Sequence, residues 1–315
     1  MKLAVRFLAS FAASLVSLLA FGGERSRLEL KPVAVVSSHF YEGALRAPRG
    51  VFVDGARGEV WVADTGNDLL AAFTPDAMEL FACRTAGVRE PIRIVVDPKG
   101  RLLVLGNQRA AIRVLTTRCE NLADLELPGV GKAPVFGTIA SDSAGNLYVG
   151  DNESGQVLVY DKDLKLTLRF GSPGRGEGEF QSISGIAADA DNIVVVDQQI
   201  TPSVQVFDRR GNFVRGWGKH DMGVENFSLP EGVALDSRGR VLVVDALRHE
   251  IKLFERDGKF IDRFGGLGSR LGQISFPSGI AVDGQGRIYV ADKGNDRVQV
   301  FEETGDVAVE PPKQP

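Results

Sequence analysis

Several residue types that commonly build reactive sites are scarce in this chain. Its 315 residues include only two cysteines, Cys83 and Cys119, and three histidines, His39, His220 and His249. The cysteines do not have the spacing of a metal-binding or redox motif. The histidines could form a zinc site only if their loops brought them together. We therefore predict no metal ion and no cofactor.

An excess of positive charge is also missing. The chain has 37 lysines and arginines against 41 aspartates and glutamates, a formal net charge of -4. Proteins that bind nucleic acids usually carry a basic surface, because the phosphate backbone dominates their affinity. We expect no nucleic-acid partner, and RNA binding is disfavoured.

No apolar run is as long as a typical membrane anchor. Lys2 and Arg6 precede an apolar run over residues 7–21, and small residues follow it. This order is typical of a secretory signal peptide, and the run is shorter than the roughly 20 residues that a spanning helix needs. We predict that residues 1–22 are removed and that the protein is exported, periplasmic or extracellular, with no membrane span after processing. A retained anchor is the alternative.

A short unit occurs six times in the sequence. Its clearest copy has strand-like segments at residues 279–283, 288–292 and 297–301. The first aspartate of each unit recurs every 43 to 47 residues, at Asp54, Asp97, Asp142, Asp189, Asp236 and Asp283. That period is typical of a four-stranded propeller blade. We predict an all-β, monomeric, six-bladed β-propeller over residues 30–303, with a flexible C-terminal tail over 304–315.

The N-terminal strand is expected to close the ring. In three units the end of the fourth strand lies 13 residues before the next unit begins, and counting back 13 residues from Pro48 reaches Val35 in an apolar segment. The sixth unit has only a weak candidate for its own fourth strand, at residues 306–310. Because an open sheet would expose unpaired edges, we predict that the segment around Val35 completes the sixth blade.

The units resemble the NHL repeat over nearly all of the chain from about residue 32 to 301. The segments at residues 292–301 (DKGNDRVQVF) and 170–180 (FGSPGRGEGEF) are the most similar. The resemblance implies a six-bladed propeller whose known members mostly bind proteins, or RNA in some intracellular cases. A minority of relatives with this architecture are metal-dependent lyases or hydrolases. The second unit departs from the pattern, because Gly106 replaces an aspartate.

The repeated aspartates are expected to be structural. One set ends the second strand of every unit except the second, and the other set ends the first strand of all six, so both sets precede turns. Carboxylates in such places accept hydrogen bonds from backbone N–H groups. The two cysteines occupy different places in the repeat, Cys83 at a position that is usually aromatic and Cys119 in a turn. Their pairing is left open, and the unlike environments weigh against it.

The best signal for a binding site is a set of unlike residues at the start of each unit's first strand. These residues are Arg49, Arg93, Thr138, Ser184, Glu231 and Ser278. They should surround the mouth of the central channel on the face that carries the histidines. We predict that Arg49, Arg93, Glu231, Arg248 and His249 bind a ligand there, while plain solvated surface is the alternative.

These observations favour an exported, non-catalytic binding or assembly module without catalytic residues. Its partner would be a protein or an anionic ligand. The alternative is a metal-dependent propeller enzyme, such as a lyase or a lactone or ester hydrolase.

Overall fold

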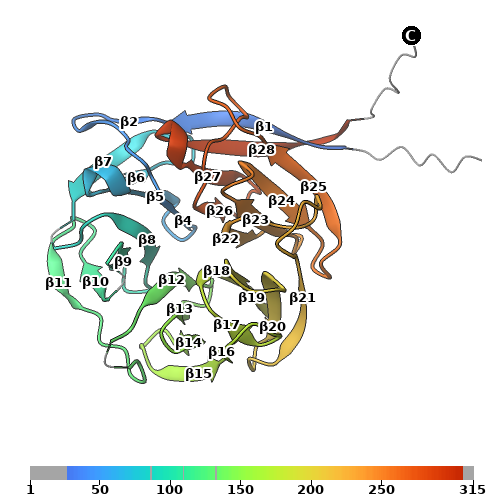
Figure 1. Cartoon of the computed structure of the whole chain (residues 1–315). Coiled ribbons are helices and arrows are strands. Elements are labelled where there is room, and N and C mark those ends of the chain that lie inside the picture. The colour runs from blue at the N-terminus through green and yellow to red at the C-terminus, as the bar shows by residue number, and fades with distance from the viewer. Residues whose placement is uncertain (1–26, 86, 109, 132, 308–315) are drawn as a thin grey trace, which may run out of the picture.

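The computed structural model describes residues 27–85, 87–108, 110–131 and 133–307, and within this part six antiparallel four-stranded sheets form a closed ring (Figure 1). Strands a to d denote the innermost to the outermost strand of each blade. Blades 1 to 3 contain β4 (Gly50–Asp54), β5 (Glu59–Asp64), β6 (Leu69–Phe73) and β7 (Glu79–Arg84); β8 (Pro91–Val96), β9 (Leu102–Gly106), β10 (Ile112–Leu115) and β11 (Asn121–Asp124); and β12 (Phe136–Ser141), β13 (Leu147–Asp151), β14 (Gln156–Tyr160) and β15 (Leu166–Phe170). Blades 4 to 6 contain β18 (Ile183–Ala188), β19 (Asn192–Asp197), β20 (Val204–Asp208) and β21 (Phe213–Trp217); β22 (Pro230–Leu235), β23 (Val241–Asp245), β24 (Glu250–Phe254) and β25 (Phe260–Gly265); and β26 (Ile280–Val282), β27 (Ile288–Asp292), β28 (Arg297–Val307) and β1 (Arg27–Val36).

Shorter elements decorate the loops between these strands. They are β2 (Ser38–His39) with β3 (Gly43–Ala44), β16 (Ser172–Pro173) with β17 (Glu179–Phe180), and the 3-10 turns η1 (Thr65–Asn67) and η2 (Lys293–Asn295). No helix of the described residues is long and apolar enough to cross a membrane. The d-to-a and b-to-c loops define the loop face of the ring, and the a-to-b and c-to-d turns define the turn face.

The prediction that the N-terminal strand closes the ring is confirmed. β1 is the outer strand of blade 6 and pairs antiparallel with β28, with Val35 opposite Gln299. Figure 1 shows the two strands side by side. β28 continues to Val307, beyond the predicted propeller boundary at residue 303. The predicted signal peptide lies outside the described residues.

The hydrophobic core is divided among the blade interfaces. Each of six clusters of buried side chains combines residues from two neighbouring blades. Trp61 of blade 1, for example, packs in one cluster with Ile94 and Leu102 of blade 2. The middle strands are buried on both faces, which explains their continuous apolar runs. The sequence repeats because every blade packs against both of its neighbours in the same way.

The aspartates at the ends of the b strands are structural. Asp197 Oδ2 accepts the backbone N–H groups of Gln181 and Ser182 at 2.8 and 2.7 Å. Asp245 accepts those of Ser228 and Leu229, both at 2.9 Å. Each carboxylate fastens the preceding d-to-a loop onto its blade. The same arrangement recurs at Asp64, Asp151 and Asp292.

The unlike environments of Cys83 and Cys119 were a misleading guide, because the structure joins these residues in a disulfide with a Cα–Cα distance of 5.9 Å. Cys83 lies on β7 of blade 1, and Cys119 lies in the c-to-d turn of blade 2. The bond therefore links neighbouring blades.

Candidate functional site

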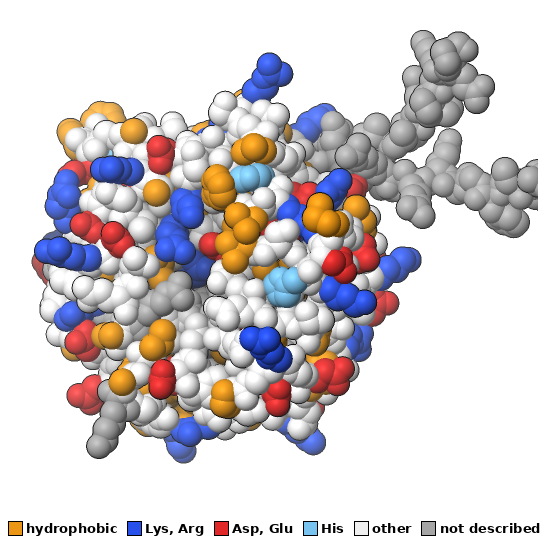
Figure 2. Space-filling model, viewed as in Figure 1, with side chains coloured by type: hydrophobic (Ala, Val, Ile, Leu, Met, Phe, Trp, Pro, Cys, Tyr) orange, Lys and Arg blue, Asp and Glu red, His pale blue; other side chains and the backbone are white. Residues whose placement is uncertain are grey.

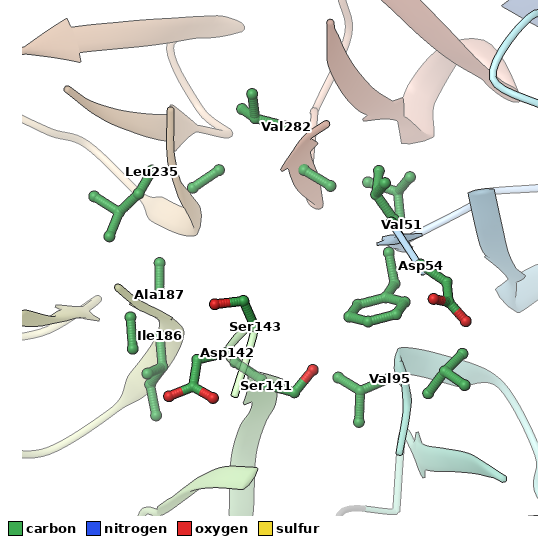
Figure 3. Close-up of a pocket in the computed structure, with 18 of the residues that line it drawn as sticks. Val51, Asp54, Val95, Ser141, Asp142, Ser143, Ile186, Ala187, Leu235 and Val282 are labelled. Atoms are coloured by element: carbon green, nitrogen blue, oxygen red, sulfur yellow. The ribbon is translucent and has the colours of Figure 1, made fainter. Parts of the chain in front are cut away.

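A cavity of about 1060 Å³ occupies the axis of the propeller and is surrounded by the six a strands (Figure 3). At one end it is lined by Arg93 and Thr138, and at the other end by the a-to-b turns of all six blades. We call this cavity the channel. The exposed turn residues place its opening on the turn face.

Six residues precede or begin the a strands and form what we call the polar ring. They are Arg49, Arg93, Thr138, Ser184, Glu231 and Ser278. Thr138, Ser184, Glu231 and Ser278 are buried, and both arginines are half-buried. The ring carries two guanidinium groups and one carboxylate, so its formal charge is +1. Of the six, Arg93 and Thr138 line the end of the channel.

Glycines bring the blades together directly beside the polar ring. A Cβ atom on Gly279 would lie 2.4 Å from the backbone oxygen of Arg49, and one on Gly232 would lie 2.6 Å from that of Ser278. Any larger residue would push the a strands apart. The recurring glycine therefore narrows the channel at the ring.

Bulges interrupt strand pairing at the same level. The pairing of strands a and b shifts register at the ring position in blades 2, 3, 4 and 5. In blade 5 the shift lies between Pro230 and Val233, so Glu231 has no regular partner on β23. Bulges redirect side chains and are frequent beside active sites. Ser184 and Glu231 thus stand outside the regular strand pairing, whereas Arg93 and Thr138 directly follow an unpaired residue.

Blades 2 to 4 form the bonded half of the polar ring. Arg93 donates to Thr138 Oγ1 at 3.3 Å and, across the channel, to the backbone oxygen of Ser184 at 3.1 Å. The Ser184 hydroxyl donates to the backbone oxygen of Pro230 at 2.9 Å. These contacts hold the three side chains in place and partly close this end of the channel.

Blades 5, 6 and 1 form the unsatisfied half. Glu231 Oε2, Ser278 Oγ and Arg49 Nε are buried atoms without a hydrogen-bond partner among the described residues. A buried polar atom left unpaired costs about 1–3 kcal/mol, so such atoms normally meet water or a ligand. Three such atoms lie on neighbouring blades: a carboxylate oxygen, a hydroxyl and a guanidinium nitrogen. Their residues are not among those that line the channel.

The opposite end of the channel has a ring of neutralised carboxylates, which we call the aspartate rim. Each aspartate caps its own a-to-b turn and pairs with an arginine, as Asp283 does with Arg287 at 2.8 Å. Burial alone would raise the pKa of Asp283, but hydrogen bonds from Arg287 and Tyr289 outweigh it and lower that pKa. The other pairs are Asp54–Arg57, Asp97–Arg101, Asp142–Arg209, Asp189–Arg256 and Asp236–Arg240.

Arg248 and His249 lie in the b-to-c turn of blade 5, away from the residues that line the channel. Arg248 donates to Ser228 Oγ at 3.0 Å and to the backbone oxygen of Gly223 at 2.7 Å. His249 Nδ1 accepts the backbone N–H of Phe276 at 3.0 Å. Both side chains thus hold neighbouring loops together. Ligand binding by Arg49, Arg93, Glu231, Arg248 and His249 stays a prediction. Figure 2 shows the loop face, with basic side chains near its centre.

The histidines do not converge. His39 hydrogen-bonds to Asp64 at 2.8 Å, and His220 lies 3.1 Å from the backbone oxygen of Ile200. Among the described residues no three histidine, cysteine, aspartate or glutamate side chains are grouped so that they could hold a metal ion. The polar ring contains one carboxylate and two guanidinium groups, a donor set that does not suit a divalent cation.

Comparisons with known proteins agree with this architecture. Residues 275–301 match the NHL repeat. No curated protein matches the chain. Solved structures that are similar include a gluconolactonase from Xanthomonas campestris (TM-score 0.61, 14% identity, 91% of this chain and 93% of that one) and a luciferin-regenerating enzyme (0.61, 14%, 89% and 96%). Another is virginiamycin B lyase from Staphylococcus aureus (0.57, 16%, 87% and 99%).

The expectation of a non-catalytic binding module is corrected by these neighbours. The similar structures include lyases, gluconolactonases and a luciferin-regenerating enzyme. The identities are low, so the likeness itself concerns the fold. The resemblance to the NHL repeat suggested binding. The repeat itself records blade packing, which catalytic and non-catalytic propellers share.

Proposed function

We propose that the protein is an enzyme, a lyase or a lactone or ester hydrolase, whose reacting groups lie in the unsatisfied half of the polar ring. The observation that carries this proposal is the group of unpaired buried atoms on Glu231, Ser278 and Arg49. The enzymes among the structural neighbours support the same class. The donor set does not suit a metal ion, so the proposal departs from the metal-dependent alternative.

Glu231 is the general base of the proposed site. Its carboxylate would take a proton from a water molecule in a hydrolase, or from the carbon next to a carbonyl in a lyase. In both reactions negative charge develops on the carbonyl oxygen, where the Arg49 guanidinium would stabilise it. The Ser278 hydroxyl would donate a further hydrogen bond to the substrate. The bonded half of the ring would keep these groups in position.

Chelator-treated protein should be assayed against lactones, esters and carbonyl compounds with a leaving group at the β carbon. We expect Glu231→Gln to lower kcat/KM at least about 100-fold, which is typical for loss of a general base. Lys162→Ala and Arg210→Ala, exposed positions in c-to-d turns, are the controls. Wild-type kcat/KM in Glu231→Gln, activity that appears only with added metal, or no turnover by folded protein would each refute the proposal.

We also propose export, for which the Cys83–Cys119 bond provides support. Structural disulfides persist mainly in oxidising compartments. N-terminal sequencing of protein recovered outside the cytoplasm should show processing near Gly22 or Gly23. An intact Met1 in that fraction would contradict the signal peptide.

A further inference from the structure

Exposed hydrophobic side chains are distributed unevenly over the protein. Among the described residues fourteen large hydrophobic side chains are exposed, and nine of them lie in d-to-a loops or in a b-to-c turn, which emerge on the loop face. Four others lie on outer strands, and one, Met78, lies in a turn on the turn face. Scattered exposed hydrophobic side chains are normal, whereas their concentration on one face marks an interaction surface.

Blades 5 and 6 carry the first part of this apolar surface. The d-to-a loop that leads into blade 5 exposes Met222, and the loop that leads into blade 6 exposes Leu267 and Leu271. The b-to-c turn of blade 5 exposes Leu247 and is hydrogen-bonded to both loops. These bonds keep the three segments together, so their apolar side chains share one region of the loop face.

The β2–β3 hairpin, in the loop that leads into blade 1, carries the second part. Phe40 and Tyr41 are 80% and 88% exposed, and their ring centroids lie 4.7 Å apart. Beneath them the buried His39 bonds to Asp64 at 2.8 Å, and the backbone N–H of Phe40 donates to Glu79 at 2.7 Å. The hairpin is therefore held in place while it presents two aromatic rings to solvent. Figure 2 shows hydrophobic side chains both near the centre of the loop face and at its upper left edge.

The segments that carry these side chains are positive, although the chain is acidic. Residues 37–49, 218–229, 246–249 and 266–279 contain five lysines and arginines against three aspartates and glutamates, a formal charge of +2, whereas the whole chain has -4. In the last of these segments Arg270 is the single charged residue and lies between two exposed leucines. A positive apolar surface is complementary to an anionic one.

We propose that this part of the loop face docks on the surface of a lipid bilayer that contains anionic lipids. The loops leading into blades 5, 6 and 1 are successive, so the exposed side chains extend over half of the ring and stand on separate loops. A protein partner needs a contiguous, well-packed apolar centre. A bilayer interface accepts separate apolar and aromatic side chains, and its anionic lipids attract basic residues. The protein would lie on the membrane without spanning it, whether or not the proposed catalytic activity is correct.

Sedimentation with lipid vesicles tests the proposal. The chain without residues 1–22 is used, because the apolar run over residues 7–21 would itself bind lipid, and this form keeps every residue of the described fold. We expect binding to vesicles made of equal parts phosphatidylglycerol and phosphatidylcholine. Binding to pure phosphatidylcholine should be at least about ten-fold weaker, because the attraction of the basic residues is lost. Absence of binding to the anionic vesicles, or equal binding to both kinds, would refute the proposal.

Two methionines on opposite faces provide a matched pair of variants. Met222 is 90% exposed on the loop face, and Met78 is 64% exposed on the turn face. Met222→Ser should weaken binding to the anionic vesicles at least about five-fold, because an apolar side chain no longer enters the interface. Met78→Ser should bind like wild type. Equal effects of the two substitutions would place the contact elsewhere and overturn the proposal.

A second copy of the chain is the other occupant that the same variants test. Light scattering after size-exclusion chromatography would measure the mass of wild type and of Met222→Ser. We expect a monomer in both cases. A dimer that Met222→Ser separates, together with no binding to vesicles, would assign this surface to self-association and overturn the lipid proposal.

Discussion

Ring closure by β1 can be tested with two charge substitutions on the same strand. Val36 lies on the buried side of β1 with 5% of its surface exposed, and Val33 on the same strand is 48% exposed. Val36 packs in the cluster between blades 6 and 1, together with Val60 and Tyr289. We expect Val36→Asp to be severely destabilising and Val33→Asp to be nearly neutral.

The magnitude follows from what each substitution removes and adds. Val36→Asp loses roughly 1.5–3 kcal/mol of apolar burial. It also places an unpaired carboxyl group in an apolar cluster, which costs about 2 kcal/mol or more even if the group is protonated. The sum is about 3.5–5 kcal/mol or more, a large share of the roughly 5–15 kcal/mol that stabilises a typical protein. Val33→Asp should stay within about 0.5 kcal/mol of wild type.

Urea unfolding followed by tryptophan fluorescence would measure both variants, because Trp61 is fully buried in the core. Val36→Asp should shift the midpoint strongly at an unchanged slope. If both variants unfolded at the wild-type urea concentration, β1 would not be closing the ring in solution. If both were equally destabilised, the two sides of β1 would not differ as the structure describes.

Three further predictions concern the disulfide, the narrow end of the channel and the aspartate rim. Replacing Cys83 and Cys119 by serine should lower the free energy of unfolding by about 3–4 kcal/mol, since the bond closes a separation of 36 residues; a reductant should then have no further effect. Gly279→Ala should cost about 1–3 kcal/mol in a thermal or urea assay, while Gly284→Ala, in open space, should not destabilise. Burial opposes ionisation of Asp142, but its hydrogen bonds outweigh burial and lower its pKa below 3.8. The stability that the ionised Asp142 contributes is therefore present above that pH and is lost as the pH falls through the folded-state pKa. The free energy of unfolding measured from pH 6 to 2 should depend less on acid in Asp142→Asn than in wild type.

The sequence was a good guide wherever one blade repeats the next. The 13-residue interval led to Val35, and the structure places that residue on the closing strand β1. The turn-capping role of the aspartates was equally predictable, because a carboxylate before a turn has nearby N–H groups in any blade. These features depend on local geometry or on the repeat itself.

The disulfide was not predictable in the same way. Repeat phase shows that Cys83 and Cys119 occupy different positions within a blade, but it does not show which positions of two blades meet. The c-to-d turn of blade 2 lies against the outer strand of blade 1, so unlike positions become neighbours. Pairing across an interface requires the relative placement of the blades, which the repeat does not record.

The polar ring was predictable from the sequence in part, and its two halves differ in whether their polar atoms have hydrogen-bond partners. The sequence showed that the ring positions hold unlike residues in the six units. The bulges and the unpaired atoms are visible only in the three-dimensional structure. In the bonded half, Arg93 donates hydrogen bonds to Thr138 and Ser184. In the unsatisfied half, Glu231 and Ser278 each have a buried atom without a hydrogen-bond partner among the described residues. Because a reacting group needs an available lone pair or proton, substitutions in the unsatisfied half should act on turnover, whereas those in the bonded half should act first on the shape of the channel.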